Sequence, residues 1–119
     1  MSRSGLANTL SCEVSTVACG TRHTVTVVGE LDLAVVGRLD AHVDDAFRDA
    51  ESVVIDLSGA QFIDSSAIHA LMRAHRRAER RSVRFEIVPA PGPVQRVFRM
   101  CGVDSHLPFA ETPVDQVTR

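Results

Sequence analysis

The sequence predicts one α/β domain, with a mixed and mostly parallel β-sheet of four to five strands and helices packed against it. Apolar, β-branched runs of strand length alternate with longer amphipathic stretches, which is the pattern of strands connected by helices. A chain of 119 residues that is 45% hydrophobic and 24% charged fits one ordinary globular domain. Because no internal repeat or linker divides the chain, we expect this domain over residues 11–119, after a flexible N-terminus over residues 1–10.

The first half of the chain predicts two strands and a helix. Residues 13–18 form a candidate first strand, and residues 24–28 are β-branched throughout and precede a glycine, which indicates a second. Residues 29–32 then turn the chain, with Asp32 as a helix N-cap. A helix follows over residues 34–50, because apolar residues recur there at three- and four-residue spacing. Its buried stripe consists of Val36, Leu39, Val43, Ala46, Phe47 and Ala50.

The second half predicts two further strand–helix pairs. The near-continuous apolar run over residues 53–57 indicates a central strand covered on both faces, and residues 58–60 are typical of a turn. A helix is predicted over residues 66–80 and an alternating strand over residues 83–88. Pro93 begins a third helix, which ends at Gly102. Residues 103–109 form either a short strand or a loop, and residues 112–117 either a helical turn or a tail.

Charge and hydropathy argue against nucleic-acid and membrane partners. The net charge of −2 gives no general attraction to nucleic acid. Arginines share one face of the helix over residues 66–80, and we interpret that face as solvated and offset by aspartates of the preceding helix. No apolar run approaches the roughly 20 residues of a membrane span, and no secretory signal is recognisable, so we expect a cytoplasmic protein. The arginines of this face are Arg73, Arg76, Arg77, Arg80 and Arg81.

Cysteine and histidine spacing indicates neither a metal centre nor a cofactor. The three cysteines fit no zinc or redox motif, so we expect free thiols in a reducing compartment, with Cys101 buried on an apolar face beside Phe98. The five histidines show no metal-ligand spacing. A nucleophile elbow and a phosphate-binding loop are both missing from the sequence, which argues against an enzyme.

Ser65 is the candidate functional residue. The tripeptide Asp64-Ser65-Ser66 follows an apolar run and opens a helix, so a serine there is expected to be exposed beside a helix N-terminus and an acidic neighbour. Such a serine suits a regulatory phosphate, which adds about −1.5 to −2 charge at neutral pH. Residue chemistry alone favours a simpler role, in which the side chains of this tripeptide only cap the helix.

Four motifs occur in a recognisable order along the chain: Gly29-Glu30-Leu31-Asp32, Val54-Ile55-Asp56-Leu57, Phe62-Ile63-Asp64-Ser65-Ser66 and the later run from Val94 to Gly102. In this order they resemble the STAS domain and more narrowly the bacterial anti-sigma-factor antagonists. The likeness covers nearly the whole chain. It departs from the family at Ala67, where many members have a glycine after the two serines, and a glycine would allow a partner to approach more closely.

The resemblance implies a partner-switching role in bacterial transcription, during sporulation or a stress response. In that family a partner that is both anti-sigma factor and serine kinase uses ATP and Mg²⁺ to phosphorylate the serine that corresponds to Ser65, with Ser66 as the alternative site. A metal-dependent serine phosphatase reverses the modification. The unphosphorylated form binds the anti-sigma factor and releases a sigma factor.

The resemblance and the predicted strand order together suggest a partner-binding surface. Its expected residues are Glu30, Asp32, Asp64, Ser65, Ser66 and Ala67. The chain itself is expected to need no cofactor or metal and to act as a kinase substrate rather than as an enzyme. The alternative is a STAS scaffold subunit of a stress-signalling or lipid-transport complex without phosphoregulation.

Overall fold

The computed structural model describes residues 12–110, so the predictions for residues 1–10 and 112–117 lie outside the described residues. In these residues four strands form one sheet of order β1-β2-β3-β4. β1 is antiparallel to β2, whereas β2, β3 and β4 run parallel, which confirms the predicted mixed, mostly parallel α/β sheet. The elements are β1 (Cys12–Cys19), β2 (Arg22–Leu31), α2 (Leu33–Asp49), β3 (Ser52–Ile63), α3 (Ser65–Arg81), β4 (Arg84–Val88) and α4 (Gly92–Met100).

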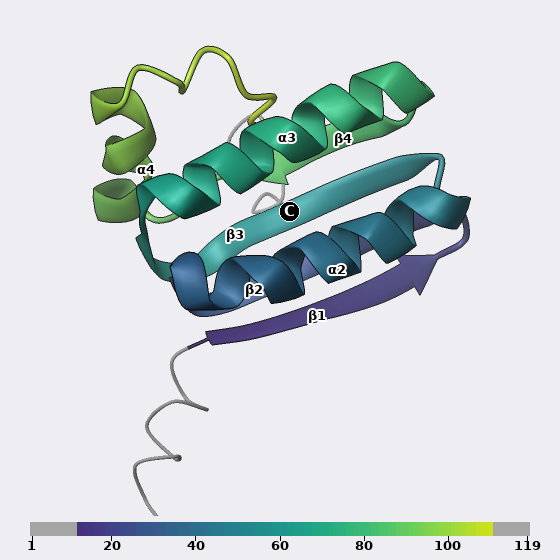
Figure 1. The fold of residues 1–119 in the computed structure, drawn as a ribbon, viewed down its shortest axis with the longest axis horizontal. Helices are drawn as coiled ribbons and strands as arrows, with labels where there is room; N and C mark the ends of the chain where they lie inside the picture. The colour runs from purple at the N-terminus through teal and green to yellow at the C-terminus, as the bar shows by residue number, and fades with distance from the viewer. Residues whose placement is uncertain (1–11, 111–119) are drawn as a thin grey trace, which may run out of the picture.

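Two helices cover one face of the sheet. α2 and α3 lie side by side across that face, and α4 lies at the end where β3 leads into α3 (Figure 1). The core between helices and sheet is made of fully buried aliphatic side chains such as Leu39 of α2, Ile55 of β3 and Leu71 of α3. None of the helices in the described residues is both long and apolar enough to cross a membrane.

β2 and β3 are longer than the sequence predicts. The predicted turn over residues 29–32 is wrong for its first three residues, because Glu30 and Leu31 pair with Phe62 and Ile63 of β3. The predicted turn over residues 58–60 is also wrong, since β3 continues through it. Both segments are instead irregularities in the β2–β3 register, where an extra residue is accommodated without ending the strand.

Two glycines make these irregularities possible. Gly29 has a φ of 111°, a left-handed conformation that other residues rarely adopt. Gly59 lies so close to β2 that a Cβ atom there would be 3.0 Å from Val28 Cγ2 and 3.2 Å from the Val27 carbonyl oxygen. The glycines that suggested turns in the sequence therefore allow β2 and β3 to pair along their full length.

α2 and α3 are joined by ion pairs on their outer surfaces. Arg73 lies 3.2 Å from Asp40, Arg77 pairs with Asp44, and the Arg77 guanidinium lies 5.3 Å from the centre of the Phe47 ring. The expected offset of the arginines by aspartates of the preceding helix is confirmed for these two. Such exposed pairs are worth little individually, so they orient the helices more than they stabilise them.

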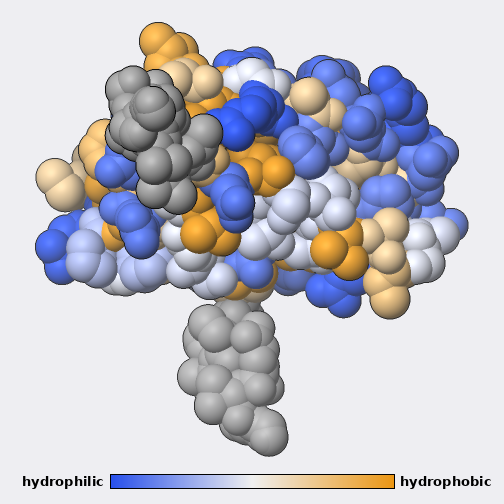
Figure 2. Space-filling model, turned by 90° about the horizontal axis from the view of Figure 1, so that it is seen from below, coloured by the Kyte–Doolittle hydropathy of each residue, from blue (hydrophilic) through white to orange (hydrophobic). Residues whose placement is uncertain are grey.

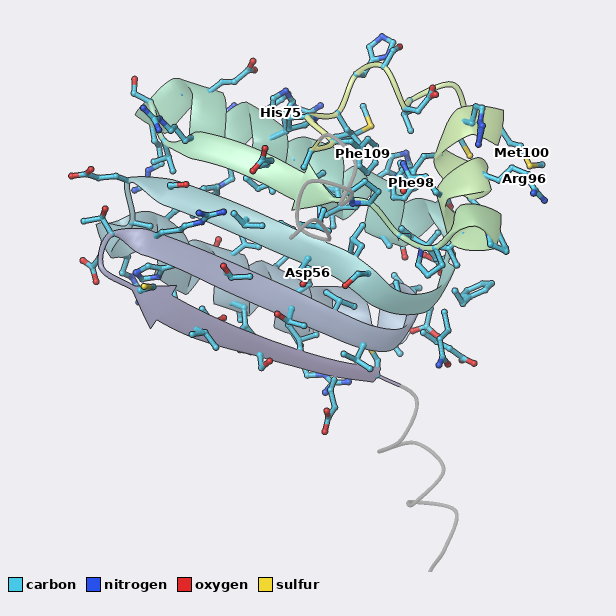
Figure 3. The ribbon with its side chains drawn as sticks, turned by 180° about the vertical axis from the view of Figure 1, so that it is seen from behind. Asp56, His75, Arg96, Phe98, Met100 and Phe109 are labelled. Atoms are coloured by element: carbon cyan, nitrogen blue, oxygen red, sulfur yellow. The ribbon has the colours of Figure 1, made fainter. Side chains whose placement is uncertain are left out.

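α4 is held to the rest of the domain by Phe98, which is fully buried. The Phe98 ring meets Phe109 edge-to-face with centroids 5.0 Å apart (Figure 3). Phe109 forms a single parallel bridge with Ile87 of β4, so residues 103–109 are a loop that touches the sheet at one point. The predicted end of the helix is confirmed by Gly102, whose φ is 74°. Pro93 occupies the second helical position rather than the first.

The prediction that Cys101 is buried is wrong. Its thiol is free but exposed, because α4 ends at Met100 and Cys101 is the C-cap. The buried stripe of this short helix consists of Val94 and Phe98, one turn apart, and does not extend to the cap.

Candidate functional site

Asp64 organises the junction between β3 and α3. It is the N-cap of α3, and its Oδ1 accepts hydrogen bonds from the Ala67 N–H at 3.1 Å and from Ser66 Oγ at 2.6 Å. Its Oδ2 accepts a third hydrogen bond, at 3.2 Å, from the N–H of Leu33 at the start of α2. One carboxylate therefore fixes the first turns of two helices that lie more than thirty residues apart in the sequence.

The β2–α2 junction lies beside this carboxylate. Asp32 caps α2 by accepting a hydrogen bond from the Ala34 N–H at 3.0 Å, as predicted. Glu30 pairs in register with Phe62, two residues before Asp64. The parallel pairing of β2 and β3 thus brings Glu30 and Asp32 to the same end of the sheet as Asp64, as the sequence led us to expect.

Ser65 is the first residue of α3, and its side chain is exposed. Its hydroxyl makes no hydrogen bond within the described part of the chain. The capping roles considered for Ser65 and Ser66 are wrong. The capping role considered for Asp64 is confirmed, because its carboxylate accepts the hydrogen bond from the Ala67 N–H at the start of α3. Ser66 is half-buried and its hydroxyl is engaged by Asp64, which leaves Ser65 as the more accessible acceptor of the two.

Ala67 has no exposed surface. Its methyl group therefore packs into the core beneath α3, and Ala67 supports the site without presenting a surface to a partner. The replacement of the family's usual glycine adds this methyl group on the inside of the helix, where alanine is also the better helix former.

Hydrogen bonding lowers the pKa of Asp64. Desolvation opposes ionisation of the carboxyl, but the hydrogen bonds from Ser66 Oγ and from the backbone N–H groups of Ala67 and Leu33 outweigh it and hold the pKa below its usual value. The site consequently carries a carboxylate at every pH near neutrality.

Asp64→Ala is expected to lower the free energy of unfolding at pH 7 by about 1 kcal/mol, the usual effect of a lost N-cap. Because the pKa of Asp64 is lowered in the folded state, its charge stabilises the fold above the unfolded pKa of about 4, and this contribution is lost as pH falls through the folded pKa. Urea unfolding of both proteins at pH 7 and at pH 3, followed by circular dichroism, should show the difference shrinking in acid. An equal difference in the free energy of unfolding at both pH values would show that the charge of Asp64 does not contribute to stability.

The surface around Ser65 is partly apolar. Leu33 is 73% exposed and Phe62 is 48% exposed, and they lie on either side of Asp64 in the two adjoining junctions. Three shallow hollows of 420, 400 and 430 Å³ are lined by other residues, none of them from residues 62–67. Exposed apolar side chains beside Ser65 suit contact with a macromolecule better than turnover of a small substrate, which usually requires a concave pocket.

The sequence of residues 16–115 matches the model of the STAS domain family. This chain belongs to the STAS domain family. The match includes both junctions of the site and confirms the resemblance that their motifs indicated. Among curated proteins, no significant match to the chain was found.

Solved structures agree with this family. The STAS domain is similar to an anti-sigma factor antagonist from Mycobacterium paratuberculosis, at 25% identity and a TM-score of 0.77, over 91% of this chain and 92% of the other. Its fold also resembles phosphorylated SpoIIAA of Bacillus, at 19% identity and a TM-score of 0.64, over 88% and 99% of the two chains. A murine Solute Carrier 26 family member A9 anion transporter contains a similar fold, at 20% identity and a TM-score of 0.64, over 76% of this chain and 15% of the transporter.

Sequence reasoning missed the two apolar residues of the site. Phe62 lies in an apolar run that suggested burial, and only the extension of β3 to Ile63 shows that Phe62 alternates outward while Ile63 is 3% exposed. Leu33 could have been noticed as an apolar residue directly after an N-cap, a position that often remains outside the core. Within residues 12–110 of the STAS domain, no three His, Cys, Asp or Glu side chains are grouped to hold a metal ion.

Proposed function

We propose that this STAS domain is an anti-sigma factor antagonist that is switched by phosphorylation of Ser65. In its unphosphorylated form it binds an anti-sigma factor that is also a serine kinase, and so releases a sigma factor in the bacterial cytoplasm. The observation that supports this most directly is the position of Ser65, an exposed and unengaged hydroxyl at the first residue of α3. The similarity to the Mycobacterium paratuberculosis antagonist over nearly the whole chain supports the same role.

The charges around Ser65 explain how a phosphate could act as a switch. Glu30, Asp32 and Asp64 lie at the same end of the sheet, and none of them forms an ion pair within the described residues. A phosphate on Ser65 would add about −1.5 to −2 charge to this group. Burying that dianion against a partner requires removal of its water, and its negative neighbours would not compensate for the loss.

Phosphorylation is expected to leave the fold intact. The N-terminus of α3 carries a partial positive charge, which favours an anion at Ser65. Because the hydroxyl is exposed and does not support the cap, the phosphate has room outside the core. The switch would therefore act on the surface, and this chain would be the substrate of a kinase and of a metal-dependent serine phosphatase rather than a catalyst.

Phosphate mapping after incubation with partner kinases tests this proposal. Each serine-kinase anti-sigma factor encoded in the source genome would be purified and incubated with the domain, ATP and Mg²⁺, and the products analysed by intact-mass and fragment mass spectrometry. We expect one phosphate on wild-type protein, mapped to Ser65, and none on Ser65→Ala. Labelling of Ser65→Ala to the same extent would move the site to Ser66 or to another residue, which the fragment masses identify. Absence of binding and of phosphate with every kinase would favour the constitutive scaffold role.

A further inference from the structure

We infer that α4 forms the second half of the docking surface around Ser65, and that the partner protein has an apolar depression with a basic rim on one side and an acidic rim on the other. This inference rests on the proposed function, because it describes how the same anti-sigma factor would bind. It assigns to α4 a role in recognition that neither the motifs nor the phosphosite suggested.

Three large exposed apolar side chains mark this end of the domain. Met100, the last residue of α4, is 77% exposed, and the exposed Leu33 and Phe62 belong to the start of α2 and the end of β3. α4 lies at the same end of the domain as these two segments (Figure 1). Hydrophobic residues, interspersed with hydrophilic ones, are visible at the same end in the space-filling view (Figure 2, left). Solvent-exposed large apolar residues that gather at one end of a domain, around a candidate regulatory residue, are typical of a protein-binding surface.

α4 presents a defined outer face. Phe98 and Val94 face the core, which fixes the rotation of the helix and turns Arg96 and Met100 outward. These two residues are four apart and therefore neighbours on one side of the helix. Both project away from the sheet in Figure 3. Because α4 is anchored by a fully buried aromatic residue, it offers a preorganised surface, which limits the entropy lost on binding.

The charges on the two halves of this surface are opposite. The half formed by the two junctions carries the carboxylates of Glu30, Asp32 and Asp64, whereas α4 carries Arg96 and Arg99. Neither arginine forms an ion pair within the described part of the chain. A partner that fits both halves must present cations to the junctions and anions to α4, with its apolar groups between them.

This charge pattern favours a protein over the other macromolecules. An anionic membrane surface and a nucleic-acid backbone are both negatively charged, and the three carboxylates of the junctions would oppose both. A stable protein interface needs about 800 Å² from each partner, which is more than the few residues around Ser65 can supply. Including α4 extends the surface across the whole end of the domain.

Binding measurements with matched variants test the role of α4. The probe is the purified anti-sigma factor kinase that labels Ser65 in the experiment above, and the readout is the Kd by calorimetry. Met100→Ser and Arg96→Glu should each raise the Kd about tenfold or more, as should Phe62→Ser. Val17→Ser is the matched control, because Val17 is 65% exposed but lies on edge strand β1, and its Kd should remain within about twofold of wild type.

The outcomes separate this inference from the proposed function. If Met100→Ser and Arg96→Glu bind as tightly as wild type while Ser65→Asp does not bind, the role of α4 is overturned and the phosphoswitch stands. If Val17→Ser weakens binding as much as Met100→Ser, the effect is not specific to this surface and the inference is overturned. If wild-type protein binds none of the kinases, the proposed function fails and the inference fails with it. Thermal unfolding of each variant confirms that it is folded.

Discussion

Ser65→Asp is expected to raise the Kd for the anti-sigma factor kinase at least about tenfold while leaving the free energy of unfolding nearly unchanged. The first effect follows because a carboxylate at this position adds negative charge beside Glu30, Asp32 and Asp64 and must be desolvated at the interface. The second follows because Ser65 is exposed and makes no hydrogen bond within residues 12–110, and because an acidic residue at a helix N-terminus is favourable.

Calorimetric titration and urea unfolding measure the two effects separately. Ser15→Asp is the matched control, since Ser15 is also exposed but lies in the middle of β1, away from the junctions. We expect its Kd to equal that of wild type. Ser65→Ala should bind as wild type does, because it adds no charge. If Ser65→Asp unfolds the domain, Ser65 is a structural residue and the phosphoswitch is not supported.

Phe98→Ala is expected to produce the largest loss of stability, about 3–5 kcal/mol in the free energy of unfolding. Phe98 is fully buried, and its ring contacts Phe109 edge-to-face, so truncation removes apolar burial and leaves a cavity between α4 and the loop that follows it. For a domain of this size such a loss corresponds to a fall in Tm of more than about 10 °C.

Met100→Ala provides the control for Phe98→Ala. Met100 lies on the same helix but is 77% exposed, so its truncation should change the free energy of unfolding by less than about 0.5 kcal/mol. Circular dichroism is the suitable probe, because the chain contains no Trp and no Tyr. If Phe98→Ala is as stable as Met100→Ala, α4 is not held by the packing described above.

The helices and the mostly parallel character of the sheet were predictable from the sequence because each depends on short-range patterns. Three- and four-residue spacing of apolar positions identified α2 and α3 to within a residue or so at their ends, and Asp32 was recognised as an N-cap from its position before the first apolar repeat. Strands separated by helices indicated parallel pairing, which β2, β3 and β4 show.

The lengths of the strands were not predictable, because they depend on which residues pair with them on the neighbouring strand. Glycines such as Gly29 and Gly59 are typical of turns, and no residue in their own segments distinguishes a turn from a bulge. The decisive fact is the close approach of β2 and β3, which leaves no room for a Cβ atom at Gly59 and extends both strands to the site. The burial of Cys101 was predicted wrongly for a similar reason, since the exposure of its side chain depends on where α4 ends.

The sequence by itself determined the family, the candidate phosphosite and the acidic residues around it, because the motif Asp64-Ser65-Ser66 and its order among the strands are local properties. Only the tertiary structure decided which residue of that motif caps α3 and which hydroxyl is left exposed. Asp64 caps α3 by accepting a hydrogen bond from the Ala67 N–H, and its other carboxylate oxygen accepts one from the N–H of Leu33, because parallel strands bring both helix starts to one end of the sheet. Leu33, Phe62 and Met100 belong to three separate segments, and the fold places the start of α2, the end of β3 and α4 at the same end of the domain (Figure 1).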